Sequence, residues 1–339
     1  MLSHRSKIYV AITVVLAAVI LIGVAVFGFN KKPAAQPVIN HLPSPVPEEK
    51  KNPFSGQAVE NEFGFFPVAV MVDNGWDVRP QYGLSQADII YEALAESNIT
   101  RLMAIYSSNT KVDKVGPVRS ARPYFASWAE EYHGAYLHVG GSPDILALLP
   151  KMNLENVDQI GVSEIYFWRE KKLKAPHNVL TSQTSWLRLG EVRGLSKKDQ
   201  MIISWLFEEA TTTGRANIKD VTINYNDIYK VDWKYNDKIG VYQRFQGDQP
   251  FVYDSGDQAG ADNIIVQIVP SKIVDNLGRR EMNVKKGGAV LIFNKFGVQS
   301  GSWENNGRTL FYNDKKEELK LVPGKTWVQV VDSLDEVKY

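Results

Sequence analysis

The sequence predicts a mixed α+β protein that begins with a transmembrane helix, and three observations carry this prediction. Residues 8–29 form a run of 22 positions without a charge. Strand and helix patterns alternate over residues 54–215, whereas strand patterns alone follow over 216–339. Such alternation is typical of a mostly parallel or mixed sheet covered on both faces. We therefore expect an α/β domain over 54–215 and a β-rich domain over 216–339.

The apolar run is long enough to span a membrane. At about 1.5 Å per residue it covers roughly 33 Å, and the hydrocarbon core is about 30 Å thick. The alternative is a cleaved signal peptide, but its apolar region usually has about 7–15 residues, and no A-x-A site follows here. Because the chain has no cysteine, a lipid anchor is excluded. We expect an uncleaved anchor after a short cytoplasmic N-terminus over residues 1–7.

A proline-rich linker over residues 30–53 follows the expected anchor. Six of the 16 prolines lie between Pro33 and Pro53, a composition typical of a semi-rigid polyproline-II stalk. Basic residues flank the span on both sides, so charge alone does not determine its orientation. A basic N-terminus, one span, a stalk and a large body indicate a single-pass protein with an extracytoplasmic body. A cytosolic body on a tail is the alternative.

The expected elements of the α/β domain alternate along the chain. The continuous apolar run at 68–72 is typical of a strand buried on both faces, and 102–106 and 135–139 are expected as the second and third strands. A capping-box-like start at Ser85 and apolar spacing through Leu94 predict a helix. Further helices are expected over 123–132, 142–149 and 196–210.

Strand patterns and turn dipeptides fill the second domain. The expected strands lie at 221–225, 231–235, 241–245, 264–269, 289–293, 298–303 and 327–331. Five aromatic residues on these strands either stack on sugar rings or pack the sheet and core. They are Trp233, Tyr235, Tyr242, Trp303 and Trp327.

The composition excludes several kinds of function. The 39 basic and 38 acidic side chains leave no strong field, so we expect no nucleic-acid partner. Without cysteine there is no thiolate nucleophile and no Cys-ligated metal. Five histidines make a His-rich centre hard to build, and we predict neither a metal site nor a cofactor.

Polar residues follow three of the expected strands. If these strands are parallel, the loops meet at the carboxyl edge of one sheet, where ligands of open α/β sheets bind. This convergence is the main functional prediction, and it depends on the parallel arrangement. The residues are Asp73 and Asn74 after the first strand, Arg119, Ser120 and Arg122 after the second, and Gly140, Gly141 and Ser142 after the third.

Two interpretations stay open for each of these loops. Arg119 and Arg122 suit a phosphate or carboxylate, or they hold a long loop through carbonyl and acidic groups. Gly140, Gly141 and Ser142 offer backbone amides to an anion, or they form a tight strand-to-helix turn for conformational reasons.

The histidines and Asp73 are the candidates for proton transfer. A histidine such as His138 beside a carboxylate such as Asp73 can act as a general base or bind a metal. A hydrogen-bonded structural histidine is the commoner case. His177 and Asn178 form a further candidate pair for ligand binding.

Glu92 lies two turns into the helix expected after Ser85. It pairs with Arg79 or Arg101 in a structural ion pair, or it acts as an acid catalyst, and Glu92 and Arg79 are kept as candidate ligand contacts. The sequence contains no G-x-S-x-G, Walker, G-x-G-x-x-G or H-E-x-x-H motif. The residues alone therefore do not decide between an enzyme and a binding protein.

Eight short motifs carry a resemblance to a known family. They lie at 67–74, 79–81, 83–93, 116–122, 138–142, 175–178, 301–303 and 323–327. On these motifs the chain resembles the YerB-like family, a group of bacterial membrane-anchored or lipoprotein-like proteins classed as a domain of unknown function. The resemblance implies an α/β part followed by a β-rich part, and it implies no established reaction. The lipobox cysteine of lipoprotein members is missing here.

Three hypotheses about function follow. In the first, the body binds an anionic or glycan component of the cell envelope through Arg119 and Arg122, and Asp73, Asn74 and His138 orient the ligand. In the second, it is an envelope hydrolase or transferase with Asp73 or His138 as general base. In the third, it is a scaffold for an unknown protein partner. Arginines buried and saturated by carboxylates would favour the scaffold.

Overall fold

The computed structural model describes residues 50–59, 65–162, 165–195, 202–208, 218–226 and 229–339. The chain divides into two compact units, Met1–Glu48 and Glu49–Tyr339, and every described residue belongs to the second. The expected N-terminus, anchor and most of the linker lie outside the described residues. Within the described ranges, no helix is both long and apolar enough to cross a membrane.

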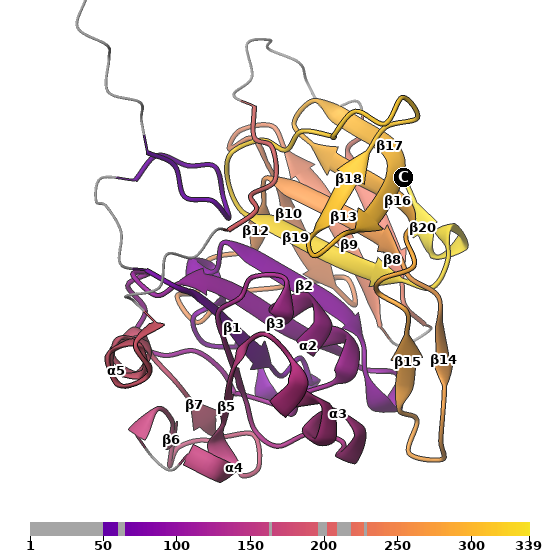
Figure 1. Ribbon diagram of the computed structural model, residues 1–339. Helices are drawn as coiled ribbons and strands as arrows, with labels where there is room; N and C mark the ends of the chain where they lie inside the picture. The colour runs from indigo at the N-terminus through magenta and orange to yellow at the C-terminus, as the bar shows by residue number, and fades with distance from the viewer. Residues whose placement is uncertain (1–49, 60–64, 163–164, 196–201, 209–217, 227–228) are drawn as a thin grey trace, which may run out of the picture. The chain divides into compact units, whose positions relative to one another are not determined.

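One ten-stranded mixed sheet contains strands from both expected domains (Figure 1). Its strands are β1 (Pro67–Val72), β2 (Ile89–Leu94), β3 (Thr100–Ser107), β4 (Ala135–His138), β5 (Glu155–Asp158), β13 (Asn263–Ile268), β16 (Gly288–Asn294), β17 (Gly297–Asn305), β18 (Thr309–Tyr312) and β19 (Thr326–Val331). Their order is β18-β17-β16-β13-β19-β2-β3-β1-β4-β5. The two halves meet where β19 pairs in parallel with β2. The expected boundary at residues 215 and 216 lies outside the described residues.

Besides short 3₁₀ turns, the described residues also form a second sheet, two hairpins and the α-helices α2 to α5. The second sheet is antiparallel and holds β8 (Asp220–Asn224), β9 (Lys230–Asn236), β10 (Val241–Gln246), β11 (Gln249–Pro250), β12 (Gly260–Ala261) and β20 (Val337–Lys338). The hairpins are β6 (Trp168–Arg169) with β7 (Val179–Leu180), and β14 (Ser271–Ile273) with β15 (Arg280–Met282). The helices are α2 (Pro123–Glu130), α3 (Pro143–Leu148), α4 (Gln159–Val162) and α5 (Gln183–Arg193). The β-rich second half is thus confirmed.

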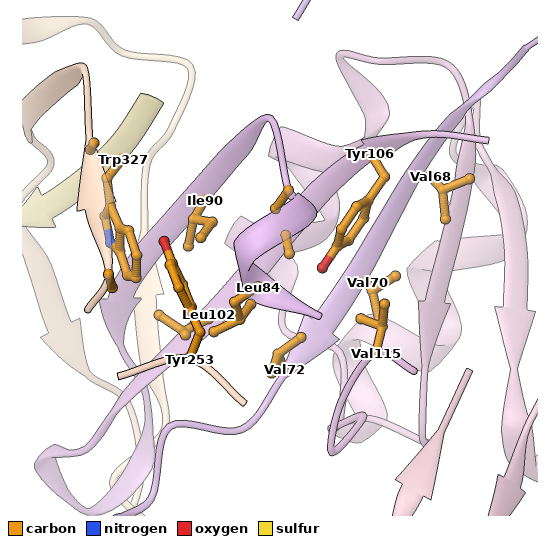
Figure 2. Close-up of a cluster of buried hydrophobic side chains, with 14 of the residues drawn as sticks. Val68, Val70, Val72, Leu84, Ile90, Leu102, Tyr106, Val115, Tyr253 and Trp327 are labelled. Carbon is orange, nitrogen blue, oxygen red and sulfur yellow. The ribbon is translucent and has the colours of Figure 1, made fainter. Parts of the chain in front are cut away.

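Both faces of the large sheet are buried. On one face, Val68, Val70 and Val72 of β1 pack in a cluster with residues of α5 and of the second sheet, part of which Figure 2 shows. On the other face, Met71 packs in a cluster that includes Trp128 of α2. The aromatic residues considered for sugar stacking serve this packing: Trp233, Tyr242, Trp303 and Trp327 are buried, and Tyr235 is half-buried.

One expected helix is a strand. Residues 89–94, predicted to continue a helix from Ser85, form β2, and all six are buried. A surface helix needs a polar face toward solvent, but both faces of β2 are covered. Its branched and aromatic residues, such as Ile90 and Tyr91, favour a strand. Only a 3₁₀ turn at Leu84–Gln86 precedes it.

A second expected helix, over 196–210, is also not found in its described part. Residues 202–208 form no helix, and Phe207 forms a parallel bridge with Leu321. Trp205 of this segment packs on Phe311 of the C-terminal half at a centroid distance of 5.5 Å. The helices expected at 123–132 and 142–149 are confirmed as α2 and α3.

The expected parallel arrangement is confirmed for β1 with β4 and is wrong for β3, which runs antiparallel to β1 and β2. The chain therefore leaves β3 at the edge opposite Asp73. The following loop returns along the sheet, where Val118 bridges to Val72 and Ala121 to Gly141. Arg119 thus reaches the carboxyl edge of β1 and β4 through a returning loop.

A buried ion pair joins the two halves of the chain. Nη2 of Arg244 on β10 donates to both oxygens of Glu92 on β2, at 2.9 and 3.0 Å, and both side chains are fully buried. Trp327 and Gln329 of β19 donate to the same carboxylate at 3.0 and 3.1 Å. Glu92 thus lies on a strand and pairs with Arg244, and the expected pairing with Arg79 or Arg101 is wrong.

We predict that Glu92→Gln destabilises the body by about 3–5 kcal/mol, because it leaves the buried Arg244 charge without its partner. Urea unfolding of residues 49–339 measures this change. Glu191→Gln, at an exposed position of α5, is the matched control and should change stability by less than about 0.5 kcal/mol. A loss below about 1 kcal/mol in Glu92→Gln would contradict the importance given to this pair.

Candidate functional site

A cleft of about 470 Å³ lies where β1 and β4 end. This volume is within the usual range of small-molecule sites, about 300–1,000 Å³. The loop after β1, the returning loop before α2 and the start of α3 all contribute to its wall, as the sequence predicted. The sequence-predicted residues that line it are Asp73, Arg119, Ser120, Arg122, Gly141, Ser142 and His177.

Asp73 is held at the cleft by three partners. Its Oδ2 lies 2.6 Å from Nδ1 of His177 and 3.0 Å from Nε of Arg119. Its Oδ1 accepts the backbone N–H of Gly75 at 3.0 Å. Burial raises the pKa of Asp73, but the Arg119 charge, the Gly75 bond and His177 together outweigh burial and hold the pKa below its usual value. Asp73 is therefore an ionised and weakly basic carboxylate, better suited to orient a neighbour than to abstract a proton.

His177 is the histidine that the fold brings to the cleft. Because its Nδ1 faces the Asp73 carboxylate, that nitrogen carries the proton in the neutral ring, and Nε2 remains as the basic nitrogen. No described residue hydrogen-bonds to Nε2, and the side chain is 29% exposed. This is the orientation that a general base requires.

Arg119 is fixed through its backbone and open at its side chain. Its N–H donates to the carbonyl of Met71, and its carbonyl accepts the N–H of Val139, each at 3.0 Å. Its side chain is 23% exposed, and Nε is close to Asp73 without the alignment of a hydrogen bond. Within the described ranges, its terminal nitrogens make no hydrogen bond.

Arg122 and Arg101, in contrast, share one carboxylate. Nε of Arg122 pairs with Glu96, and Nη2 of Arg101 lies 3.4 Å from Glu96. Burial raises the pKa of Glu96, but the hydrogen bond from Arg122 and the two guanidinium charges lower it overall. Arg122 also donates to the carbonyl of Ala121. The loop-holding interpretation therefore describes Arg122, whereas Arg119 keeps the free terminal donors that the anion-binding interpretation requires.

Ser142 adds an unpaired hydroxyl to the wall. The residue is 7% exposed, and its Oγ has no hydrogen-bond partner among the described residues. Leaving a buried hydroxyl unpaired costs roughly 1–3 kcal/mol. Gly140 adopts φ +58°, and its N–H donates to Asp158 at 2.7 Å. Gly140 thus serves the turn, and its amide is not open to an anion.

His138 does not line the cleft. It is fully buried in β4, with Nδ1 2.8 Å from the Gly140 carbonyl and Nε2 2.7 Å from Oδ1 of Asn156. Both ring nitrogens have structural partners, so the geometry gives no support to His138 as a base or ligand contact. Asn178 also lies outside the lining, and its Oδ1 accepts from Arg169 at 2.8 Å.

Asn74 and Arg79 belong to the packed network behind the cleft. Asn74 is fully buried and donates to Glu92 and Thr100 at 3.2 and 2.8 Å. Arg79 donates to the Asn74 carbonyl at 3.0 Å, and its guanidinium lies 4.2 Å from the ring centroid of Trp76. With Glu92 buried in the same network, these three predicted ligand contacts serve structure.

Sequence reasoning missed several residues of the wall. Glu96 and Ile99 follow β2 and line the cleft. Because a helix was expected in place of β2, these residues were not recognised as lying at the end of a strand. Leu277 and Arg279 come from the β14–β15 hairpin in the other half of the chain, and no local signal links them to Asp73. In the part of the chain that the structure describes, His, Asp and Glu nowhere form a group of three that could hold a metal.

We predict that Asp73→Asn lowers stability by about 1–2 kcal/mol at pH 7, because charged hydrogen bonds are lost. The folded-state pKa of Asp73 is depressed, so its contribution is present above the ordinary value of 3.8 and is lost as the pH falls through the folded value. The difference from wild type should therefore shrink below about pH 4.

Urea unfolding between pH 3 and pH 8 measures this difference, with Asp314→Asn at an exposed position as the control. A difference that stays constant over the whole pH range would show that the ionised form of Asp73 has no special stabilisation.

Comparison with known proteins identifies the family to which this chain belongs. Residues 54–196 match the N-terminal domain, and 221–328 the C-terminal domain, of the family described as protein of unknown function DUF3048. A relative named "Putative lipoprotein YerB", from Bacillus subtilis (strain 168), is 34% identical over 275 residues, which are 79% of this chain and 82% of that protein. A crystal structure of YerB from Bacillus subtilis aligns with a TM-score of 0.77 and 32% identity, over 86% of this chain and 99% of that chain. The chain therefore belongs to the YerB-like DUF3048 family, as its motifs indicated.

Proposed function

We propose that the cleft binds an anionic group of a cell-envelope component and that Arg119 is its principal contact. One observation carries this proposal: the Arg119 guanidinium lines the cleft with terminal donors that no described residue uses. Guanidinium groups bind carboxylates and phosphates through two parallel hydrogen bonds. The unpaired Oγ of Ser142 supplies a further polar group at the same wall.

The charge of the lining favours a ligand with one anionic group. Of the four arginines that line the cleft, Arg101 and Arg122 pair with Glu96, and Arg279 pairs with Asp275. The fourth, Arg119, lies beside Asp73 and has terminal donors that no described residue uses. A neutral glycan would leave the Arg119 charge without an anionic ligand, and a long polyanion would meet the carboxylates of Asp73, Asp77 and Glu96. An anionic component is therefore preferred to a neutral glycan.

The proposal includes an anchored, extracytoplasmic body. The uncharged run at 8–29 supports a single membrane span with a cytoplasmic N-terminus, and the proline-rich segment supports a stalk. The similar protein from Bacillus subtilis carries the word lipoprotein in its name. Digestion of intact cells by an added protease tests this topology: loss of the full body supports it, and complete protection contradicts it.

A hydrolase or transferase at the same site is the second candidate, and one contact favours it. The 2.6 Å pairing of His177 with Asp73 leaves Nε2 as a base at the cleft. In this candidate the base is His177 in place of His138, and Asp73 orients it. His177→Gln should then abolish turnover of a bound ligand while leaving its affinity within a few-fold.

We predict that inorganic phosphate stabilises residues 49–339 and that Arg119→Ala removes this effect. At 100 times its dissociation constant, a ligand adds about 2.7 kcal/mol. This corresponds to a rise in Tm of about 5 °C for a protein of this size. Thermal unfolding at constant ionic strength, with chloride as the reference anion, measures the shift, and sulfate and acetate are tested beside phosphate.

Arg188→Ala, at an exposed position of α5, is the matched control and should keep the shift. An equal shift in a folded Arg119→Ala variant would place the anion elsewhere. If none of the three anions shifts the Tm of the wild type, the proposed anion site is contradicted and the protein-binding scaffold is favoured.

A further inference from the structure

We infer that the ligand of the cleft is an amphiphilic phosphate ester, with its phosphate at Arg119 and its apolar chain along the β14–β15 hairpin. The inference rests on the proposed function, because the phosphate takes the place of the anionic group. It starts from one feature of the wall: the hairpin that supplies Arg279 to the cleft also supplies Leu277.

The hairpin exposes a cluster of apolar side chains. Ile273 is 59% exposed, Val274 51% and Leu277 71%. Exposed apolar residues on a monomeric protein are normally scattered, and a group of them marks a contact surface for a ligand, protein or membrane. Figure 1 shows the hairpin as a narrow arm that extends from the body beside α3.

Polar contacts attach the turn end of this arm to both sides of the cleft. Nη1 of Arg279 lies 3.9 Å from Asp144 of α3, next to the Ser142 wall. Nη2 of Arg280 donates to Oδ1 of Asn98 at 3.2 Å, next to the Glu96 wall. These contacts hold Leu277 at the cleft, and Ile273 and Val274 belong to the same arm.

The dimensions of the cleft call for more than a single anion. A volume of about 470 Å³ lies within the range of sites that hold whole small molecules, about 300–1,000 Å³. A phosphate group fills only a part of this space. Ile99, 36% exposed, and Leu277 provide apolar surface for the rest.

Phosphate fits the polar end better than carboxylate does. Arg119, Ser142 and His177 come from three separate segments and leave a guanidinium, a hydroxyl and a ring nitrogen at the wall. A phosphate has more acceptor oxygens than a carboxylate and can accept hydrogen bonds from both the Arg119 guanidinium and the Ser142 hydroxyl. The lining thus combines the free Arg119 donors with the exposed apolar side chain of Leu277, and an amphiphile can use both.

Calorimetric titration of residues 49–339 with inorganic phosphate, ethyl phosphate and hexyl phosphate tests the inference. A fully buried methylene group improves Kd about fourfold. Partial burial on the arm should make hexyl phosphate bind at least about tenfold more tightly than ethyl phosphate. Leu277→Ser should reduce this gain to about threefold or less and leave the affinity for inorganic phosphate unchanged.

Leu187→Ser, at a 42% exposed position of α5, is the matched control and should retain the whole gain. Equal affinities for ethyl and hexyl phosphate in wild type, or a full gain in Leu277→Ser, would overturn the inference and leave the anion site standing. Failure of all three probes to bind would overturn the proposed function as well.

Vesicles distinguish the two sources of such an ester. Flotation of the body with phosphatidylcholine vesicles that contain phosphatidic acid, lost in both Arg119→Ala and Leu277→Ser, would identify a membrane lipid. Chain-length dependence in the titration without flotation would identify a soluble phosphate ester.

Discussion

The buried carboxylate of Glu92 is the constraint on which the rest of the body depends. It accepts hydrogen bonds from five side chains, those of Asn74, Thr100, Arg244, Trp327 and Gln329. A buried charge needs such hydrogen-bond partners, because each unpaired polar group in the interior costs free energy. These partners connect β2 to β10 and β19. The Glu92 carboxylate also holds Asn74, which directly follows the cleft-lining residue Asp73. The position of the cleft is therefore tied to the junction between the two halves of the chain.

Two carboxylates pair with three of the four arginines that line the cleft. Glu96 takes Arg101 and Arg122, whereas Asp73 is shared between Arg119 and His177. His177 is one of the contacts that lower the pKa of Asp73, and it faces that carboxylate with Nδ1, while no described residue uses its Nε2. The same geometry therefore supports an anion site and a general base, and an amphiphilic phosphate ester is compatible with both.

The sequence predicted ten of the twenty strands that the structure describes, the buried strands β1 and β3 among them, but it predicted a helix for β2. At β2 the spacing of Ile89, Ile90, Ala93 and Leu94 matches a helical stripe, because a fully buried strand lacks the alternation that identifies half-buried ones. Loop position correctly predicted Asp73, Arg119 and Ser142 at the cleft. Loop position gave the wrong location for His138. This residue ends β4, and its buried ring hydrogen-bonds to Asn156 instead of lining the cleft.

By itself the sequence determined the absence of cysteine chemistry, the β-rich second half, the cationic loop before Pro123 and the family. These are properties of composition, short-range pattern and motif. Only the tertiary structure decided that the terminal nitrogens of Arg119 have no partner among the described residues. It also decided that His177 and Leu277, and not His138, line the cleft. The physical reason is that the partners of a charge and the exposure of an apolar side chain depend on contacts between segments far apart in the chain.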